Sequence, residues 1–418
     1  MFCACACAWQ AGAQPPTQLA PVFRIFGTEQ GLPSGQVHAL AEDREGRLWI
    51  GTANGLVRYD GHEFVGYPAR LDQPDALAST SVEALAIDAA GQVWVATEGG
   101  RLARWRPASD DFERIDLAAT HSEQLEVWAL ATLGTRVFVG TYGAGLVELD
   151  ATGGLQRRFD LPEALGGPHV LDLLAAQESL WLITLERHLL HFDGASGSFA
   201  EVMVAPGEPL TSAYGMGLRQ GDVWFSTRDG QLCSVNGDHL ARCEPLPLLA
   251  LPARARMLLS GERGDWVGGM GELLHRVDGR AQRGAYQPGR FGGVPQQALW
   301  TALADRDAGL WFGSNGGGLL HLPADADRFQ VWQPQAGGSV GLRDGRIRGI
   351  EHDAAGRVWI ASLNAGLHRM AADGGEIQAL ALPGTEQKRV WSVLAPGAEE
   401  LWVGHQDAGQ MAQVQSLL

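Results

Sequence analysis

Few residues in this sequence have the type and spacing needed for catalysis. Gly337–Gly341 matches G-x-S-x-G around Ser339, but a nucleophile elbow needs a strand-to-helix turn, and no helical pattern follows. His188 and His191 are close in the sequence but have no evident third ligand for a metal. HExxH, CxxC and phosphate-binding glycine motifs are absent. We therefore predict no catalytic residue, no metal, no cofactor and no enzyme activity.

A different chemistry, hydrogen bonding to and stacking on a small polar ligand, is available to residues that each follow a short apolar segment. Binding residues tend to lie on loops held by a rigid scaffold. Asn and Gly are also favoured in turns for conformational reasons, so turn formation is the alternative role. We predict ligand contacts from Asn54, Glu98, Tyr142, Glu186, Arg228, Asn315 and Asn364; Met270 occupies the same position in its own repeat.

The apolar segments that must position these residues are copies of one pattern. An aromatic residue, usually with a small residue two positions later, recurs nine times at intervals of 42 to 48 residues. Helical repeats of this length need amphipathic helices, which the sequence lacks, whereas four-stranded propeller blades have this period. We predict an all-β protein of nine β-propeller blades, anchored by Trp49, Trp94, Phe138, Trp181, Trp224, Trp266, Trp311, Trp359 and Trp402.

The first repeat shows how such a blade would form, with predicted strands at 37–41, 47–52, 55–59 and 63–67 from the inside of the ring outward. Side chains alternate along a strand, so Trp49 can insert between one blade and the next. The small Gly51 permits close approach of the neighbouring sheet, a rule that Ile183 breaks in the fourth repeat. We expect the nine aromatic residues to serve packing, and the loops after each second strand to lie on one face near a central channel.

Nine repeats exceed the usual four to about eight blades of one propeller. We predict a seven-bladed ring over residues 23–333 and the first two blades of a second, incomplete propeller over 334–418. The segment 23–26 resembles the outer strands and can complete the seventh blade, which would close the ring and remove exposed sheet edges. Because the sequence stops just after the ninth second strand, we expect it to be a fragment.

Three features bear on the compartment and on partners. Residues 1–13 resemble the end of a secretory signal, with a cleavage site at Ala11–Ala13, and 14–22 form a linker. Cys233 and Cys243 flank a short turn, so they could form a disulfide in an oxidising compartment or remain two buried thiols. The net charge of −16 argues against nucleic-acid binding.

The first repeat carries a specific combination of residues: Gln30–Ser34, Val37–Leu40, Glu42, Asp43, Gly46, Leu48–Thr52, Gly55, Leu56 and Tyr59–Gly61. This combination resembles the two-component regulator propeller family. The resemblance implies two seven-bladed rings outside the cytoplasmic membrane, an immunoglobulin-like domain, a membrane helix, and a histidine kinase or diguanylate cyclase as output. It also implies sensing of nutrients, often glycans. This sequence contains no complete second ring, membrane helix or output domain.

Three functions remain open at this stage. The first, which we predict, is a periplasmic sensor that binds a small polar ligand such as a glycan and acts with further receptor domains or a receptor dimer partner. The second is a propeller enzyme similar to the streptogramin lyases, which would bring a His and a carboxylate together near the ring axis with a metal between them. The third is a protein-interaction propeller without a small ligand.

Overall fold

The computed structural model describes residues 22–115, 117, 126–235, 237–246, 255–277, 280–286, 292–326, 331–332, 334, 341–372, 376–380, 389–397, 400–407 and 410–412. The predicted signal remnant at 1–13, nearly all of the linker at 14–22, and Ser339 lie outside these residues. The chain divides into two compact units, one of which is Ala20–Asp327 and the other of which includes Arg328–Leu418. This boundary falls shortly before the predicted division at residue 333.

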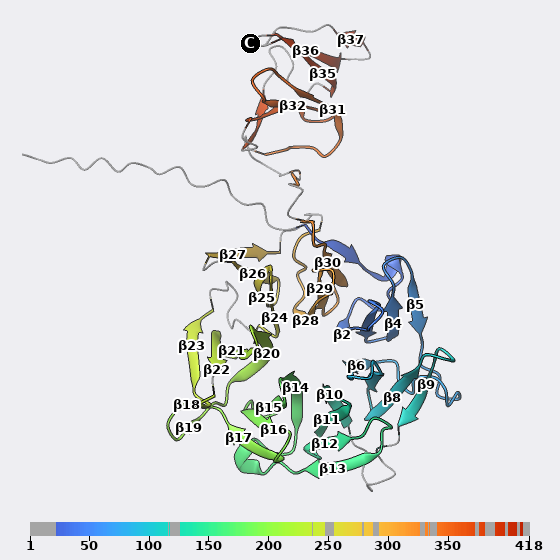
Figure 1. Ribbon diagram of the computed structural model, residues 1–418. Helices are drawn as coiled ribbons and strands as arrows, with labels where there is room; N and C mark the ends of the chain where they lie inside the picture. Colours follow the sequence, from blue (N-terminus) through green and yellow to red (C-terminus); the bar gives the residue numbers. More distant parts are fainter. Residues whose placement is uncertain are drawn as a thin grey trace, which may run out of the picture. The chain divides into compact units, whose positions relative to one another are not determined.

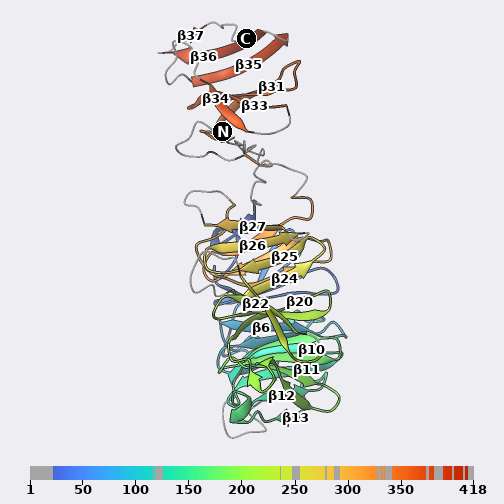
Figure 2. The same ribbon diagram turned by 90° about the vertical axis from the view of Figure 1, so that its left-hand side faces the viewer.

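Within its described residues, the first unit contains seven antiparallel four-stranded sheets around a central axis, so it is a seven-bladed β-propeller (Figures 1 and 2). Blade 1 is β2–β5 (Val37–Glu42, Leu48–Thr52, Gly55–Tyr59, Phe64–Tyr67), blade 2 is β6–β9 (Val82–Ile87, Val93–Thr97, Arg101–Arg106, Asp111–Ile115), and blade 3 is β10–β13 (Glu126–Leu133, Arg136–Tyr142, Leu146–Leu149, Leu155–Phe159).

The next three blades follow in chain order. They are β14–β17 (Val170–Ala176, Ser179–Thr184, Leu189–Asp193, Ser198–Glu201), β20–β23 (Ala213–Arg219, Asp222–Thr227, Gln231–Val235, Ala241–Pro245) and β24–β27 (Met257–Gly261, Gly264–Gly268, Glu272–Val277, Arg280–Ala285). A short hairpin, β18–β19 (Met203–Ala205, Glu208–Pro209), lies between the fourth and fifth blades in the sequence, and single 3-10 turns occur at Thr28–Gln30 and Glu163–Leu165.

The N-terminal strand closes the ring, as the sequence predicted. Blade 7 consists of β28 (Leu299–Ala304), β29 (Leu310–Ser314), β30 (Leu319–Leu322) and, as its outer strand, β1 (Arg24–Phe26), which pairs with β30. Phe26 is buried and its ring packs against Tyr59, Phe64 and Trp311. The first and last blades of the ring therefore share one aromatic cluster, and the closed array leaves no free edge between them.

The predicted wedge role of the aromatic residues is confirmed in the ring. Trp49 is fully buried and packs edge-to-face on Trp105 of blade 2, with ring centroids 5.0 Å apart. An aspartate, half-buried at Asp305 and buried in the other three cases, also fixes four of the tryptophans, because its carboxylate accepts the indole N–H: the pairs are Asp43–Trp49, Asp88–Trp94, Asp305–Trp311 and, in the second unit, Asp353–Trp359. The same aspartates cap the hairpin between the first and second strands by accepting backbone N–H groups.

The small residue two positions after the aromatic one allows the next blade to approach. A Cβ atom on Gly51 would lie 2.7 Å from the side chain of Val82, and one on Gly140 would lie 2.8 Å from Val170. Blade 4 departs from the rule with the buried Ile183, which packs in one cluster with Ala213, the small residue that begins the inner strand of blade 5; blades 1 to 4 have Val at that position.

The second unit contains two further sheets in its described residues. One is β31–β34 (Ile347–His352, Val358–Ser362, Gly366–Met370, Ile377–Leu380) and the other is β35–β37 (Arg389–Gly397, Glu400–Asp407, Gln410–Ala412). Trp359 is buried as predicted, but Trp402 is 48% exposed, so its predicted role as a buried anchor is wrong. Each other wedge is covered by the following blade, and no sheet follows β37 among the described residues.

Candidate functional site

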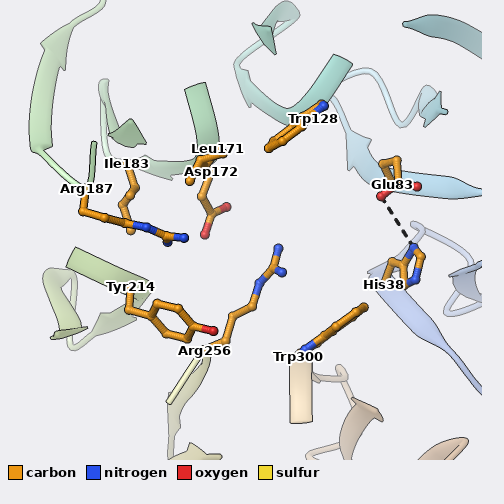
Figure 3. A pocket seen from close by; sticks show the side chains of 10 residues that line it. All are labelled: His38, Glu83, Trp128, Leu171, Asp172, Ile183, Arg187, Tyr214, Arg256 and Trp300. Atoms are coloured by element: carbon orange, nitrogen blue, oxygen red, sulfur yellow. Dashed lines mark ion pairs between the residues drawn. The ribbon is translucent and has the colours of Figure 1, made fainter. Parts of the chain in front are cut away.

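A cavity of about 280 Å³ lies on the axis of the seven-bladed ring. Every blade contributes to it, which places it in the central channel (Figure 3). A second cavity of about 220 Å³ shares seven of the same residues and is lined by the inner strands. The side chains around the first cavity are His38, Glu83, Trp128, Leu171, Asp172, Ile183, Arg187, Tyr214, Arg256 and Trp300.

A β-bulge at the start of the inner strand explains why these side chains face the channel. In blade 1, Val37 pairs with Thr52 and Ala39 with Gly51, which leaves His38 as an extra, unpaired residue. A bulged residue is re-aimed relative to the regular alternation of the strand. The same register shift exposes the equivalent residues Glu83, Trp128, Leu171, Tyr214 and Trp300 in five other blades. Arg256 holds this place in blade 6, immediately before β24.

The part of the cavity formed by blades 4 to 6 concentrates charge. Figure 3 shows the carboxyl group of Asp172 and the guanidinium groups of Arg187 and Arg256 pointing toward the same region. Burial raises the pKa of Asp172, while the charges of Arg256 and Arg187 act in the opposite direction. Arg187 has a positive φ of 69°, an unfavourable backbone region for a residue with a side chain. The charges of the two arginines therefore offset part of the effect that burial has on the pKa of Asp172.

The remaining polar groups lie on the side formed by blades 7, 1 and 2. Nδ1 of His38 is 3.6 Å from a carboxylate oxygen of Glu83 and 3.2 Å from the carbonyl oxygen of Val82. The His38 ring lies 5.3 Å from the indole of Trp300, and the guanidinium of Arg256 lies over that indole at 5.5 Å. The cavity thus has aromatic faces and two groups of polar side chains. Asp172, Arg187 and Arg256 lie at one end, and the His38–Glu83 pair lies at the other.

The seven predicted ligand-binding residues lie elsewhere, and none lines this cavity. Asn54, Glu98, Glu186, Arg228 and Asn364 are exposed in the turns after their second strands, and Asn364 belongs to the second unit. Asn54 acts as a turn residue, with its amide N–H on the carbonyl of Pro33 and its backbone N–H on the hydroxyl of Thr52. Asn315 accepts a hydrogen bond from Gln36, and Met270 is exposed.

These turns nevertheless lie at the same end of the ring as the cavity. Because the hairpin is antiparallel, the end of the second strand pairs with the start of the inner strand, as Thr52 does with Val37. Tyr142 comes nearest of the predicted residues, since its ring stacks on Trp128 at 5.2 Å and on His169 at 4.0 Å. The turn that contains Glu186 contributes its neighbour Arg187 instead.

A signal for the channel residues was present in the sequence. Each inner strand begins with an apolar residue, then a variable residue, then most often a small one, as in Val37–Ala39, Val82–Ala84 and Val127–Ala129. Regular alternation would place the variable residue inside the sheet packing, where His, Glu and Arg are costly. Their recurrence there indicates an unpaired position that faces solvent or a channel.

The other candidate residues have structural roles. Cys233 and Cys243 pair directly across β22 and β23 and are joined by a disulfide. His188 is held by Glu201, and His191 packs on Trp181. Among the described residues, no group of three or more His, Cys, Asp or Glu side chains is arranged to hold a metal. We also find no helix in the described part of the chain with the length and apolarity to span a bilayer.

Comparisons with known proteins agree with a propeller fold. The model of the two component regulator propeller family matches residues 31–54, which confirms the resemblance seen in the first blade. A 46-residue segment is 41% identical to Histidine kinase P4 of Formosa agariphila, covering 11% of this chain and 3% of the kinase.

Two solved structures share the fold. The extracellular domain assigned to a hybrid two component system of B. thetaiotaomicron aligns with a TM-score of 0.70 at 17% identity, over 95% of this chain and 55% of that one. A streptogramin B lyase aligns with a TM-score of 0.58 at 14% identity, over 72% of this chain and 97% of that one. The chain therefore spans about half of the extracellular domain that it resembles.

Proposed function

We propose that this chain is the ligand-binding part of an extracytoplasmic sensor of a bacterial signalling receptor, and that a small polar molecule, such as a sugar unit of a glycan, binds in the channel cavity. One observation carries the proposal. All seven blades direct a side chain to the axis, and these side chains combine aromatic faces with a few convergent polar groups, which is the composition of small-molecule sites.

Two further observations support the location and the signalling role. The first is the likeness in fold to the extracellular domain of a two component system. The second is the disulfide between Cys233 and Cys243, a bond that persists in oxidising compartments such as the periplasm. Signalling to a histidine kinase or a diguanylate cyclase would proceed through further receptor domains or a second receptor chain. It requires that the ligand bind one receptor arrangement more tightly than another.

Thermal unfolding of the full chain in the presence of neutral mono- and oligosaccharides and other small polar metabolites tests the proposal. A ligand at 100 times its Kd stabilises the native state by about 2.7 kcal/mol. We expect a ligand that raises the Tm of the parent chain but not of a Trp128→Ala/Trp300→Ala variant, whereas Trp402→Ala, outside the ring, keeps the response. A panel without any stabilising compound, or a shift that persists in the double variant, would refute the cavity as the binding site.

A second function, an acid–base enzyme of the lyase type, is favoured by one observation. His38 and Glu83 come together at the channel with 3.6 Å between Nδ1 and Oε2. A lyase of this type requires such a His and carboxylate near the axis, with a metal between them. No group of side chains that could hold this metal is found among the described residues. Mass-spectrometric analysis of any ligand found above, after incubation with the chain and with Glu83→Gln, separates the two: conversion that Glu83→Gln abolishes would establish the enzyme.

A further inference from the structure

The channel cavity also contains enough detail to define the chemistry of its ligand, an inference that rests on the proposed function. Four of its side chains present hydrogen-bond donors that find no acceptor among the described residues. They are the guanidinium of Arg256, the hydroxyl of Tyr214 and the indole N–H groups of Trp128 and Trp300. Arg and Trp can only donate. The cavity therefore matches a ligand rich in acceptor oxygens.

The charged side chains of the cavity indicate which acceptor group the ligand carries. Arg256 and Asp172 both line the cavity, and no ion pair within 4.0 Å joins them in the described structure. The guanidinium of Arg256 instead lies over the indole of Trp300, 5.5 Å from its centroid, and that of Arg187 lies over the ring of Tyr214 at 5.1 Å. A guanidinium that lies over an aromatic ring, as that of Arg256 does, keeps its planar edge for a carboxylate.

The size and shape of the cavity indicate what the body of the ligand can be. A volume of about 280 Å³ equals the share of roughly nine waters in the liquid, which suits a single sugar ring or a small organic acid rather than a polymer. Trp128 of blade 3 and Trp300 of blade 7 lie on opposite sides of the cavity (Figure 3). A flat or ring-shaped body can therefore contact an indole on each side.

We propose that the cavity binds a small carboxylate, such as an acidic monosaccharide, with its carboxylate at the end formed by Arg187, Arg256 and Tyr214. The body of the ligand lies between Trp128 and Trp300, and a hydroxyl reaches the His38–Glu83 pair. A doubly charged phosphate fits less well, because Asp172 and Glu83 would repel its second charge.

Proton uptake by Asp172 provides a second, independent measurement of acid binding. Across the cavity Asp172 faces Arg187, Arg256, Tyr214, His38 and Glu83. A bound carboxylate adds a negative charge near Asp172 and raises its pKa further. Binding of the acid should therefore take up protons, an effect that a neutral ligand lacks.

The test compares D-galacturonate and D-glucuronate with D-galactose, D-glucose and D-galactose 1-phosphate, using the full chain. Tryptophan fluorescence and thermal shift report binding. We expect the acids to bind about tenfold more tightly than the neutral sugars, in line with the strength of a charge-assisted hydrogen bond. Arg256→Gln should abolish this preference, while Arg101→Gln, an exposed arginine outside the cavity, should keep it.

Asp172→Asn provides the complementary variant. It should bind the acids at least as tightly as the parent chain and should lose the proton uptake, measured by calorimetry in buffers of different ionisation enthalpy. Equal binding of acids and neutral sugars, tighter binding of the phosphate, or binding of none of these probes would overturn the carboxylate inference. Neutral ligands that bind in the cavity would at the same time leave the proposed sensor function standing.

Discussion

The hydrogen bond between a buried aspartate and the wedge tryptophan predicts a large effect of one small substitution, Asp43→Ala. The Asp43 carboxylate is 2% exposed; it accepts the Trp49 indole N–H at 2.9 Å and the backbone N–H groups of Glu45 and Arg47 at 3.1 and 2.9 Å. Its removal leaves the indole N–H buried without a partner, which costs about 1–3 kcal/mol. Loss of the turn cap adds about 1 kcal/mol.

We therefore expect Asp43→Ala to lower the free energy of unfolding of the ring by about 3 kcal/mol. Scanning calorimetry of the full chain should show the Tm of the ring falling by roughly 5–10 °C. Asp72→Ala is the control, because Asp72 is exposed and has no hydrogen bond among the described residues. A Tm for Asp43→Ala within about 1 °C of that of the control would refute this account of blade stability.

Blades 5 and 6 lack the aspartate that binds the wedge tryptophan, so they provide a second test of this hydrogen bond. Trp224 and Trp266 are as deeply buried as Trp49, but their indole N–H groups have no partner in the described structure. Six residues earlier, where blade 1 has Asp43, these blades have Leu218 and Ser260. Trp224→Phe should therefore cost less stability than Trp49→Phe, because only the latter removes a hydrogen bond as well as volume.

Three further predictions address closure, acid sensitivity and redox state. Phe26→Ala should destabilise the ring by about 3–5 kcal/mol, since it empties the aromatic cluster that joins blades 7 and 1; a calorimetric loss no larger than that of Trp402→Ala would contradict this. Burial opposes the charge of Asp353, but hydrogen bonds from Trp359 and Arg357 outweigh it and lower its pKa to about 2. Its contribution to the second unit should be complete above about pH 4 and vanish as the pH falls toward 2, and Asp353→Asn should flatten that profile in acid unfolding followed by circular dichroism. Reduction of the Cys233–Cys243 disulfide should lower the free energy of unfolding by about 2–3 kcal/mol, and the Tm with it. A Cys233→Ser/Cys243→Ser variant should be insensitive to reductant.

The blade framework was predictable from the sequence because its residues obey a strict physical requirement. Trp49 and its counterparts must fill the gap between two sheets, and Gly51 must let the next inner strand approach. These needs recur once per blade, so they appear as a period. Trp402 shows the limit of such reasoning, because the period marks where a wedge belongs and not whether another sheet covers it.

The candidate site was predictable only in part, for a different reason. The turn residues such as Asn54 were placed at the correct end of the ring, but the side chains that reach the axis come from bulges such as the one at His38. A bulge changes the direction of one side chain without changing the spacing of the apolar residues around it. Strand alternation alone therefore assigns His38 to the wrong face.

The bulge position also separates the residues that build the fold from those that define the ligand. It makes no ladder pair and is free of the packing demands on Trp49 or Gly51, so its identity can vary from blade to blade. The second unit keeps the same device, with register shifts at Arg348 and Trp391, whose guanidinium and indole lie 5.0 Å apart. Arginine and tryptophan thus recur at these positions in both units. Substitutions there should alter ligand preference while leaving the blades intact, whereas substitutions at the wedge should do the opposite.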